Sequence, residues 1–287
     1  MSKLVIGCGY LGRRVADRWL AAGHRVSAVS RSGERAATLR AAGIDCQVAD
    51  VLRPETLRCL PAAETVLYAI GWDRNAGVSI RDLYAGGLRN VLAHLPADTS
   101  RFIYVSSTGV FGQTDGGWVD EQSACNPTRV GGLACLEAET LLREHAIGEK
   151  SIILRMAGIY GPDRIPRRRQ LLEGRPIAAP SDGFLNLIHV QDAARIVLAA
   201  ERRLDPPCLL CVSDGHPVVR GDYYRELAEL VGAAEPRFAT PPVDAPATDR
   251  ASSNKRVSNK LLLEKLGIDL RYPSYRQGLA AECGRDP

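Results

Sequence analysis

Apolar runs and amphipathic stretches alternate along the first 155 residues of the chain. Each apolar run is short and rich in Val, Ile and Leu, a composition typical of buried β-strands. The predicted strands lie at 3–6, 25–29, 45–49, 65–70, 101–106 and 151–155. The stretches between them place apolar residues at helical spacing, and the predicted helices lie at 11–22, 34–42, 54–60, 79–95 and 131–145.

This regular order of strand and helix predicts the fold class. Parallel strands joined by right-handed helical crossovers form a sheet with helices on both faces. We therefore expect an α/β protein with a Rossmann-type, doubly wound parallel sheet.

The pattern loosens after residue 158, and the second half predicts a small C-terminal lobe. Two stretches rich in Pro, at 161–184 and 235–253, are typical of extended loops. Further strands are predicted at 186–190 and 208–212, and further helices at 191–202, 222–231, 259–266 and 274–281. The expected domains are a Rossmann domain at 1–160, with a returning segment at about 186–212, and a smaller lobe at 161–287.

A glycine-rich turn follows the first predicted strand, where residues 7–12 spell GCGYLG. In a strand–turn–helix context, Gly7 permits the tight turn, Gly9 lets a pyrophosphate approach the backbone, and Gly12 lets the helix pack closely. The free N–H groups at the start of the helix favour phosphate oxygens. The sequence therefore predicts a dinucleotide site formed by Gly7, Gly9, Tyr10, Leu11 and Gly12.

The end of the second predicted strand indicates which dinucleotide binds. NAD sites usually place a carboxylate there for the ribose hydroxyls, whereas this chain has Arg31, whose guanidinium matches a 2′-phosphate. Further donors follow from Ser30, Ser32 and Arg35. The prediction is NADP, with NAD as the alternative and Glu34 as the residue that would favour it.

Two other strand ends complete the predicted cofactor site. Asp50 follows the third strand, where its carboxylate either meets an adenine amino group or caps the turn before Pro54. The segment Ala69, Ile70 and Gly71 ends the fourth strand, at the edge of the sheet where a dinucleotide lies.

Three further segments resemble motifs of the extended short-chain dehydrogenases/reductases, the NAD-dependent epimerase/dehydratase family. Residues 105–112 (VSSTGVFG) resemble its SS-x-x-VYG segment, and residues 154–164 (LRMAGIYGPDR) resemble its LR-x-x-x-x-YGP-x-R segment. Residues 188–192 (IHVQD) resemble its HV-x-D segment. Together with the glycine turn, these segments make four motifs that follow one another in the family's order. The resemblance therefore covers nearly the whole chain.

The resemblance implies a Tyr acid/base, a Lys four residues later, a Ser and often an Asn. Ser107 matches the Ser, but the Tyr and Lys positions fall at Val130 and Ala134, and the Asn position at Tyr84. Three of the four positions have therefore departed from the pattern, as in the atypical groups of the family.

Other residues near the expected active site could replace the missing acid or contact the substrate. Tyr84 carries a phenol that could face the nicotinamide, although packing of its helix against the sheet is the alternative explanation. Arg164 and His189 are the predicted substrate contacts, with a loop anchor and a structural hydrogen bond as their respective alternatives.

Composition narrows the classes of function. A net charge of +4 with one dense basic run at 167–169 does not favour nucleic-acid binding, and the run is either a solvated loop or a clamp for a phosphorylated small molecule. We expect a cytoplasmic protein without a membrane span or secretory signal, because a strand begins at Lys3 and no long apolar stretch exists. Cys208 and Cys211 have metal-ligand spacing but lie on one strand, where their thiols diverge, so no metal site is expected.

Two functional hypotheses follow. The first is an NAD(P)-dependent oxidoreductase or epimerase/dehydratase acting on an unknown substrate, such as a nucleotide sugar or another anion. The second is a non-catalytic NADP(H)-binding sensor or partner-binding protein. The oligomeric state is not predicted.

Overall fold

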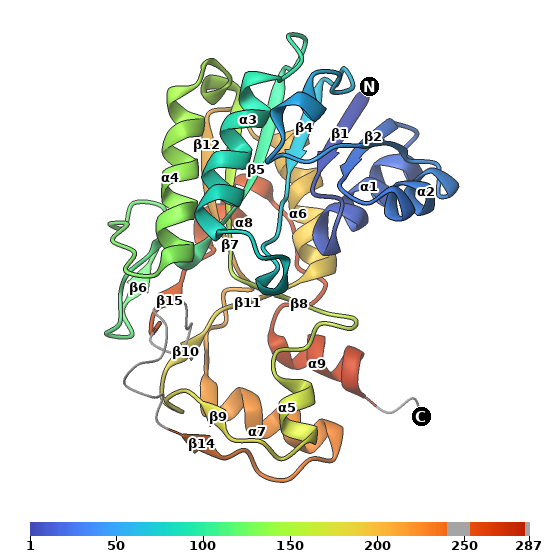
Figure 1. Ribbon diagram of the computed structural model, residues 1–287. Helices are drawn as coiled ribbons and strands as arrows, with labels where there is room; N and C mark the ends of the chain where they lie inside the picture. Colours follow the sequence, from blue (N-terminus) through green and yellow to red (C-terminus); the bar gives the residue numbers. More distant parts are fainter. Residues whose placement is uncertain (240–252, 285–287) are drawn as a thin grey trace. The chain divides into compact units, whose positions relative to one another are not determined.

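The computed structural model describes residues 1–239 and 253–284, and its contacts divide the chain into two compact units (Figure 1). Unit 1 comprises Met1–Ser107, Val130–Arg155 and Ala194–Leu210. Unit 2 comprises Thr108–Arg129, Met156–Ala193 and Cys211–Pro287. Each unit is therefore assembled from separate stretches of the chain.

The central sheet has seven strands among the described residues, in the order β12-β7-β5-β4-β1-β2-β3 (Figure 1). They are β1 (Ser2–Ile6), β2 (Arg25–Ser30), β3 (Asp45–Val48), β4 (Thr65–Tyr68), β5 (Arg101–Ser107), β7 (Ser151–Met156) and β12 (Cys208–Val212). Strand β1 pairs in parallel with both β2 and β4, so the chain winds outward in both directions from β1. The predicted doubly wound α/β fold is confirmed.

Helices cover both faces of this sheet. They are α1 (Tyr10–Ala21), α2 (Gly33–Ala41), α3 (Gly87–Ala93), α4 (Val130–Glu144) and α6 (Val190–Arg203), the last of which runs through both units. Leu4 and Ile6 of β1 pack in one cluster with Leu88 of α3 and Ala138 of α4. Val5, between them, faces Gly12 of α1 on the other side. Alternate strand residues thus supply two apolar layers, as a sheet with two covered faces requires.

One predicted helix differs from the observed structure. The predicted helix at 79–95 is observed as a helical stretch from 80 to 93, which widens into a π-helical turn, η3 (Asp82–Gly86), before α3. Gly87, at the junction, lies so close to Val51 that a Cβ there would be 2.8 Å from its Cγ2. The periodicity of apolar residues reports the covered face of a helix but not a one-turn widening within it. Short 3₁₀ turns are η1 (Pro54–Leu57), η2 (Arg74–Ala76), η4 (Thr108–Val110) and η5 (Ala146–Lys150).

Unit 2 combines short strand pairs with helices. Strands β8 (Gly158–Tyr160) and β11 (Leu187–His189) pair in parallel. The other pairs are β6 (Trp118–Val119) with β15 (Arg256–Val257), β9 (Ile177–Ala178) with β14 (Phe238–Ala239), and β10 (Phe184–Leu185) with β13 (Val218–Val219). The helices are α5 (Arg168–Leu172), α7 (Arg220–Val231), α8 (Lys260–Leu266) and α9 (Tyr275–Cys283). Most of the predicted loop 235–253 lies outside the described residues.

The core of unit 2 centres on aromatic side chains. Tyr160, Tyr223 and Tyr275 are buried together with Leu227 and Leu279. Because these residues come from β8, α7 and α9, the C-terminal helix is part of this core. None of the helices in the described parts of the chain has the length and apolar character needed to cross a membrane.

Candidate cofactor site and active site

The three glycines of the turn between β1 and α1 have different surroundings. Gly7 has a φ of +95°, and a Cβ on it would lie 2.6 Å from the carbonyl carbon of Ala69. A Cβ on Gly12 would overlap the carbonyl oxygen of Gly7. A Cβ on Gly9 would meet no heavy atom within 4 Å among the described residues. Gly7 and Gly12 are therefore required by packing, whereas Gly9 borders open space.

The open side of Gly9 lies at the N-terminus of α1. Gly9 is the N-cap of this helix, and the first helical turn contains no acidic residue. The first backbone N–H groups of a helix have no partner within it, and they carry a partial positive charge. This combination of open backbone and positive potential fits the pyrophosphate of a dinucleotide.

Arg35 reaches this turn from α2. Its Nη2 donates a hydrogen bond to the carbonyl oxygen of Cys8 at 2.7 Å. Ser32 caps α2 by accepting the N–H of Arg35 on its Oγ at 3.3 Å, and the N–H of Ser32 donates to Oγ of Ser30 at 3.3 Å. The structure thus links Ser30, Ser32 and Arg35 to the glycine turn. Arg31 lies exposed at the end of β2.

The end of β4 borders the same turn, whereas β3 lies beyond β2 in the sheet. The N–H of Ala69 donates to the carbonyl of Ile6 at 2.8 Å, which holds the segment after β4 beside Gly7. Ala69 and Ile70 are half-buried and Gly71 is exposed. Asp50 accepts the N–H of Leu52 on Oδ1 at 3.0 Å, as a turn cap does. Its contact with an adenine stays a prediction.

Tyr84 lies in the π-helical turn η3 and is half-buried. Its hydroxyl accepts the backbone N–H of Trp72 at 3.2 Å, which places the phenol just beyond the end of β4. Single π-helical turns occur frequently at functional sites. The position and the geometry are compatible with the predicted role of Tyr84 in proton transfer, which stays a prediction.

The two serines at the end of β5 differ in what they contact. Ser106 is buried and donates its Oγ hydrogen to Oε1 of Glu139 at 2.6 Å. Because successive side chains of a strand point to opposite faces, Ser107 points away from this contact. Ser107 is half-buried, so it is the better placed of the two to reach a bound molecule.

A buried ion pair supports the end of β5. The side chain of Glu139 on α4 has no exposed surface, and it accepts hydrogen bonds from Nε and Nη2 of Arg155 at 3.0 and 2.7 Å. Arg143 adds a third contact at 2.9 Å. The sequence analysis missed this network, although a Glu and an Arg inside apolar stretches were a signal for it.

The first turns of α4 carry apolar residues at the positions where the family has its Tyr and Lys. Val130 is 41% exposed, whereas Ala134 is 1% exposed. A side chain at residue 130 is therefore accessible, but a lysine at residue 134 would be buried. Neither residue can exchange a proton, so the family's usual acid/base step has no proton donor at these two positions.

In unit 2, the two predicted substrate residues have different environments. His189 is fully buried, and its Nε2 lies 3.1 Å from Oε1 of Glu282 on α9. Arg164 is exposed, and its backbone pairs with that of Gly161 in a tight turn. The basic run is partly engaged, since Arg169 pairs with Glu173 at 2.7 Å. The contacts of Arg164 and His189 with a substrate stay predictions.

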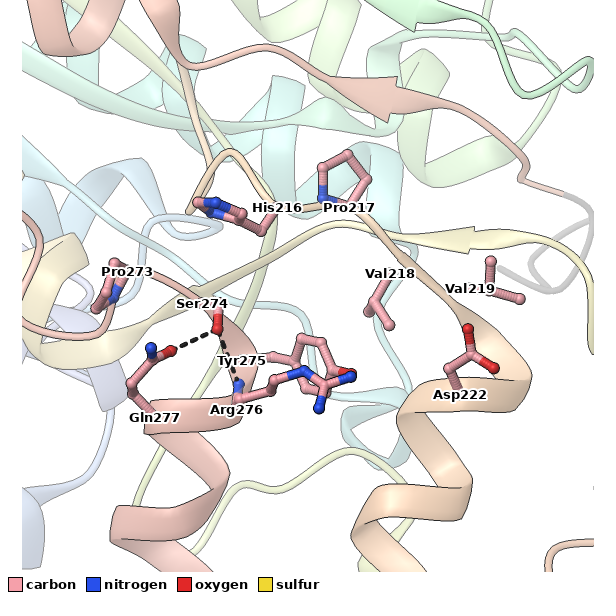
Figure 2. A pocket seen from close by; sticks show the side chains of 10 residues that line it. All are labelled: His216, Pro217, Val218, Val219, Asp222, Pro273, Ser274, Tyr275, Arg276 and Gln277. Carbon is pink, nitrogen blue, oxygen red and sulfur yellow. Dashed lines mark hydrogen bonds between the residues drawn. The ribbon is translucent and has the colours of Figure 1, made fainter.

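Figure 2 shows a pocket of unit 2 between α9 and the loop before α7. Its volume is about 540 Å³. It is lined by His216–Val219, Asp222 and Pro273–Gln277, none of which is a predicted site residue. Ser274 accepts the N–H of Arg276 on its Oγ at 3.3 Å and caps α9 at the pocket wall.

Two buried ionisable residues of unit 2 also escaped the sequence analysis. Lys255 is 3% exposed, and its Nζ donates to the carbonyl of Phe111 at 3.0 Å and to Oγ of Ser253 at 2.9 Å. Burial lowers the pKa of Lys255 to about 8, and Arg129 adds to the effect. Asp214 is 3% exposed and lies two residues after the end of β12, and its place close to a strand end was the available signal.

The comparisons with known proteins agree with this geometry. Residues 4–207 match the NAD dependent epimerase/dehydratase family. Protein YeeZ of Escherichia coli (strain K12) is 26% identical over 242 residues, which cover 82% of this chain and 85% of that protein.

Solved structures extend the likeness to the full chain. A Methylobacillus flagellatus protein, provisionally described as an NAD-dependent epimerase/dehydratase, is 35% identical with a TM-score of 0.76, covering 98% of this chain and 97% of its own. A UDP-glucuronic acid 4-epimerase of Bacillus cereus, in complex with UDP-glucuronic acid and NAD, shares the fold at 18% identity and a TM-score of 0.79, covering 98% of each chain. With its glycine turn, its strand order and a match over most of its length, the chain belongs to the NAD dependent epimerase/dehydratase family.

Proposed function

We propose that this protein is an NADP(H)-dependent oxidoreductase or epimerase of atypical type that acts on an anionic small molecule. The observation that carries the proposal is the hydrogen bond from the Arg35 guanidinium to the carbonyl of Cys8 in the glycine turn. It holds a cation beside the open face of Gly9. The family and the surroundings of Gly9 support a nicotinamide dinucleotide.

Charge at the end of β2 supports NADP(H) over NAD(H). Residues 30–32 are Ser-Arg-Ser, so the usual carboxylate for the ribose hydroxyls is missing. Arg31 is exposed there, and Arg35 lies one helical turn further along α2. A dianionic 2′-phosphate gains charge-assisted hydrogen bonds from such guanidinium groups. Glu34, in the first turn of α2, is the opposing charge.

The proposed chemistry uses few protein groups. NADP(H), when bound, supplies or accepts a hydride. Ser107 donates a hydrogen bond to the substrate oxygen, and the Tyr84 phenol is the proton donor. The anionic character of the substrate is proposed from Arg164 and the run Arg167–Arg169. The Bacillus cereus relative, which holds UDP-glucuronic acid, provides a precedent for an anionic substrate in this fold.

Calorimetric titration with NADP⁺ and NAD⁺ tests the cofactor assignment. Arg31→Ala and Arg35→Ala should each weaken NADP⁺ binding by about 1.5–3 kcal/mol, roughly 10- to 150-fold, and NAD⁺ binding much less. Arg25→Ala, at the opposite end of β2, is the matched control and should change neither affinity. Equal affinity of the native protein for NADP⁺ and NAD⁺ would contradict the assignment.

A second candidate function is a non-catalytic NADP(H) sensor that contacts a partner protein. It is favoured by Val130 and Ala134, which leave the usual acid/base positions without a titratable group. NADPH oxidation with a panel of carbonyl compounds and UDP-sugars separates the two candidates. Under the first, Ser107→Ala and Tyr84→Phe should each lower the rate by roughly 10²–10⁴-fold without loss of NADPH binding. A rate indifferent to both changes would place the active site elsewhere.

A further inference from the structure

Helix α9 packs against a tyrosine in the core of unit 2. A Cβ on Gly278 would overlap the hydroxyl of Tyr160, so only glycine permits this approach. Tyr160 is fully buried and belongs to the same core cluster as Leu279 of α9. The C-terminal helix therefore covers the Tyr160 hydroxyl directly.

Polar groups gather beneath α9. The hydroxyls of Tyr160 and Tyr223 and the Oδ2 atom of Asp214 are buried without a hydrogen-bond partner among the described residues. The other carboxylate oxygen, Oδ1, accepts the N–H of His216 at 2.9 Å. The Asp214 carboxyl is close enough to Tyr160 to help burial raise the pKa of that phenol, and Tyr160 has the same effect on Tyr223. A buried polar atom without a partner calls for a physical explanation.

Charged groups on the neighbouring elements are paired. Asp192 of α6 accepts the N–H groups of Arg271 and Tyr272 at 2.9 and 2.8 Å, and so fixes the segment before α9. His189 of β11 contacts Glu282 of α9, and its ring lies 3.9 Å from that of Tyr272. On the loop of Asp214 itself, His216 directs Nδ1 to the Asp214 carbonyl oxygen at 3.1 Å.

The charge of this cluster depends on whether the Asp214 carboxyl is protonated. Asp214 is 3% exposed, and burial raises its pKa from the usual 3.8 to about 7, against the opposing effect of the backbone N–H groups of His216 and Asp214. A neutral carboxyl carries no charge that burial would desolvate, so it tolerates this site without a partner on Oδ2. An ionised carboxyl at the same place is a buried charge without a counterion on Oδ2.

We propose that Asp214 is a proton-linked clamp for the C-terminal helix, which docks α9 firmly when its carboxyl is neutral and loosens it when the carboxyl ionises. Opening of α9 uncovers Tyr160 and hydrates the Asp214 carboxyl, which then returns to its ordinary acidity. The stabilisation is therefore complete below about pH 4 and is lost as the pH rises to about 7. Above that range the opening equilibrium no longer changes with pH through this group.

Hydrogen exchange of the segment 271–283 tests the clamp on the full chain. After correction for the intrinsic rate, its opening constant should rise roughly tenfold per pH unit between pH 5 and pH 7 and level off by pH 8. Asp214→Asn carries a permanently neutral group and should remove this dependence. Asp222→Asn, at a half-exposed carboxylate of α7, is the matched control and should retain it.

A second measurement decides the matter without any variant. The ¹³C shift of the Asp214 carboxyl in the native protein should titrate with a midpoint near 7. A midpoint near 4 overturns the proposal, even if Asp214→Asn fails to fold. Equal pH dependence of exchange in the native protein and in Asp214→Asn overturns it as well.

Discussion

Polar groups gather at both ends of the strands in the sheet of unit 1. One group surrounds Lys3 at the amino ends of the strands, and the other surrounds Gly9 at their carboxyl ends. At the amino ends, Glu201 of α6 accepts hydrogen bonds from Nε1 of Trp19 at 2.7 Å and from Oγ1 of Thr65 at 2.7 Å. Lys3 forms an ion pair with the same carboxylate, and the side chains of Lys3 and Glu201 are 3% and 9% exposed. Both carboxylate oxygens are thus engaged in a dry environment.

The carboxyl ends have the opposite character. Gly9 borders open space, α1 begins there without an acidic residue, and Arg31 and Arg35 are exposed. Saturated polar groups in a core stabilise a fold, whereas oriented polar groups facing open space are available to a ligand. Lys3 and Glu201 therefore stabilise the fold, whereas Arg31 and Arg35 are available to a ligand.

The largest effect is expected from Lys3→Met. Removing the ammonium leaves the Glu201 carboxylate buried beside an apolar side chain, and breaking such a pair costs about 3–5 kcal/mol. Urea denaturation measures the loss in the free energy of unfolding. Arg53→Met breaks an exposed pair with Glu55, where both side chains are more than half exposed, and should cost at most about 1 kcal/mol. Similar losses in the two variants would remove the contrast between buried and exposed pairs.

A smaller effect distinguishes two glycines of the same turn. Gly12→Ala forces a methyl group against the Gly7 carbonyl and should destabilise the fold by about 1–3 kcal/mol. Gly9→Ala meets open space and should leave the melting temperature nearly unchanged, while it weakens NADP⁺ binding in calorimetry. Native affinity in a folded Gly9→Ala protein would show that the pyrophosphate does not approach this face.

The smallest effect is expected at the N-cap of α2. Ser32→Ala removes the acceptor for the N–H of Arg35 and should cost about 1 kcal/mol. Because the cap sets the start of the helix that carries Arg35, NADP⁺ affinity should fall with stability. Thr38→Ala, whose Oγ1 hydrogen goes to the Glu34 carbonyl within the same helix, should affect stability without that change in affinity. A stable Ser32→Ala protein with native affinity would mean that α2 holds Arg35 without this cap.

Much of unit 1 follows from local pattern. Strands β1 to β5 and helices α1, α2 and α4 lie within a few residues of their predicted positions, because apolar periodicity and Gly or Pro stop signals are local properties. The π-helical turn at Asp82–Gly86 did not follow, since apolar periodicity does not report a one-turn widening within a helix. The predicted contacts of the cofactor and substrate residues stay predictions.

The sequence by itself determined the order of strands and helices, the glycine turn and the basic character of the end of β2. These features depend on residues that are close along the chain. Only the tertiary structure decided which charges are saturated and which are available: Glu201 meets Lys3 from 198 positions away, and Asp214 lies near Tyr160 in the core that α9 covers. Burial and pairing arise from contacts between distant segments, and no local pattern encodes them.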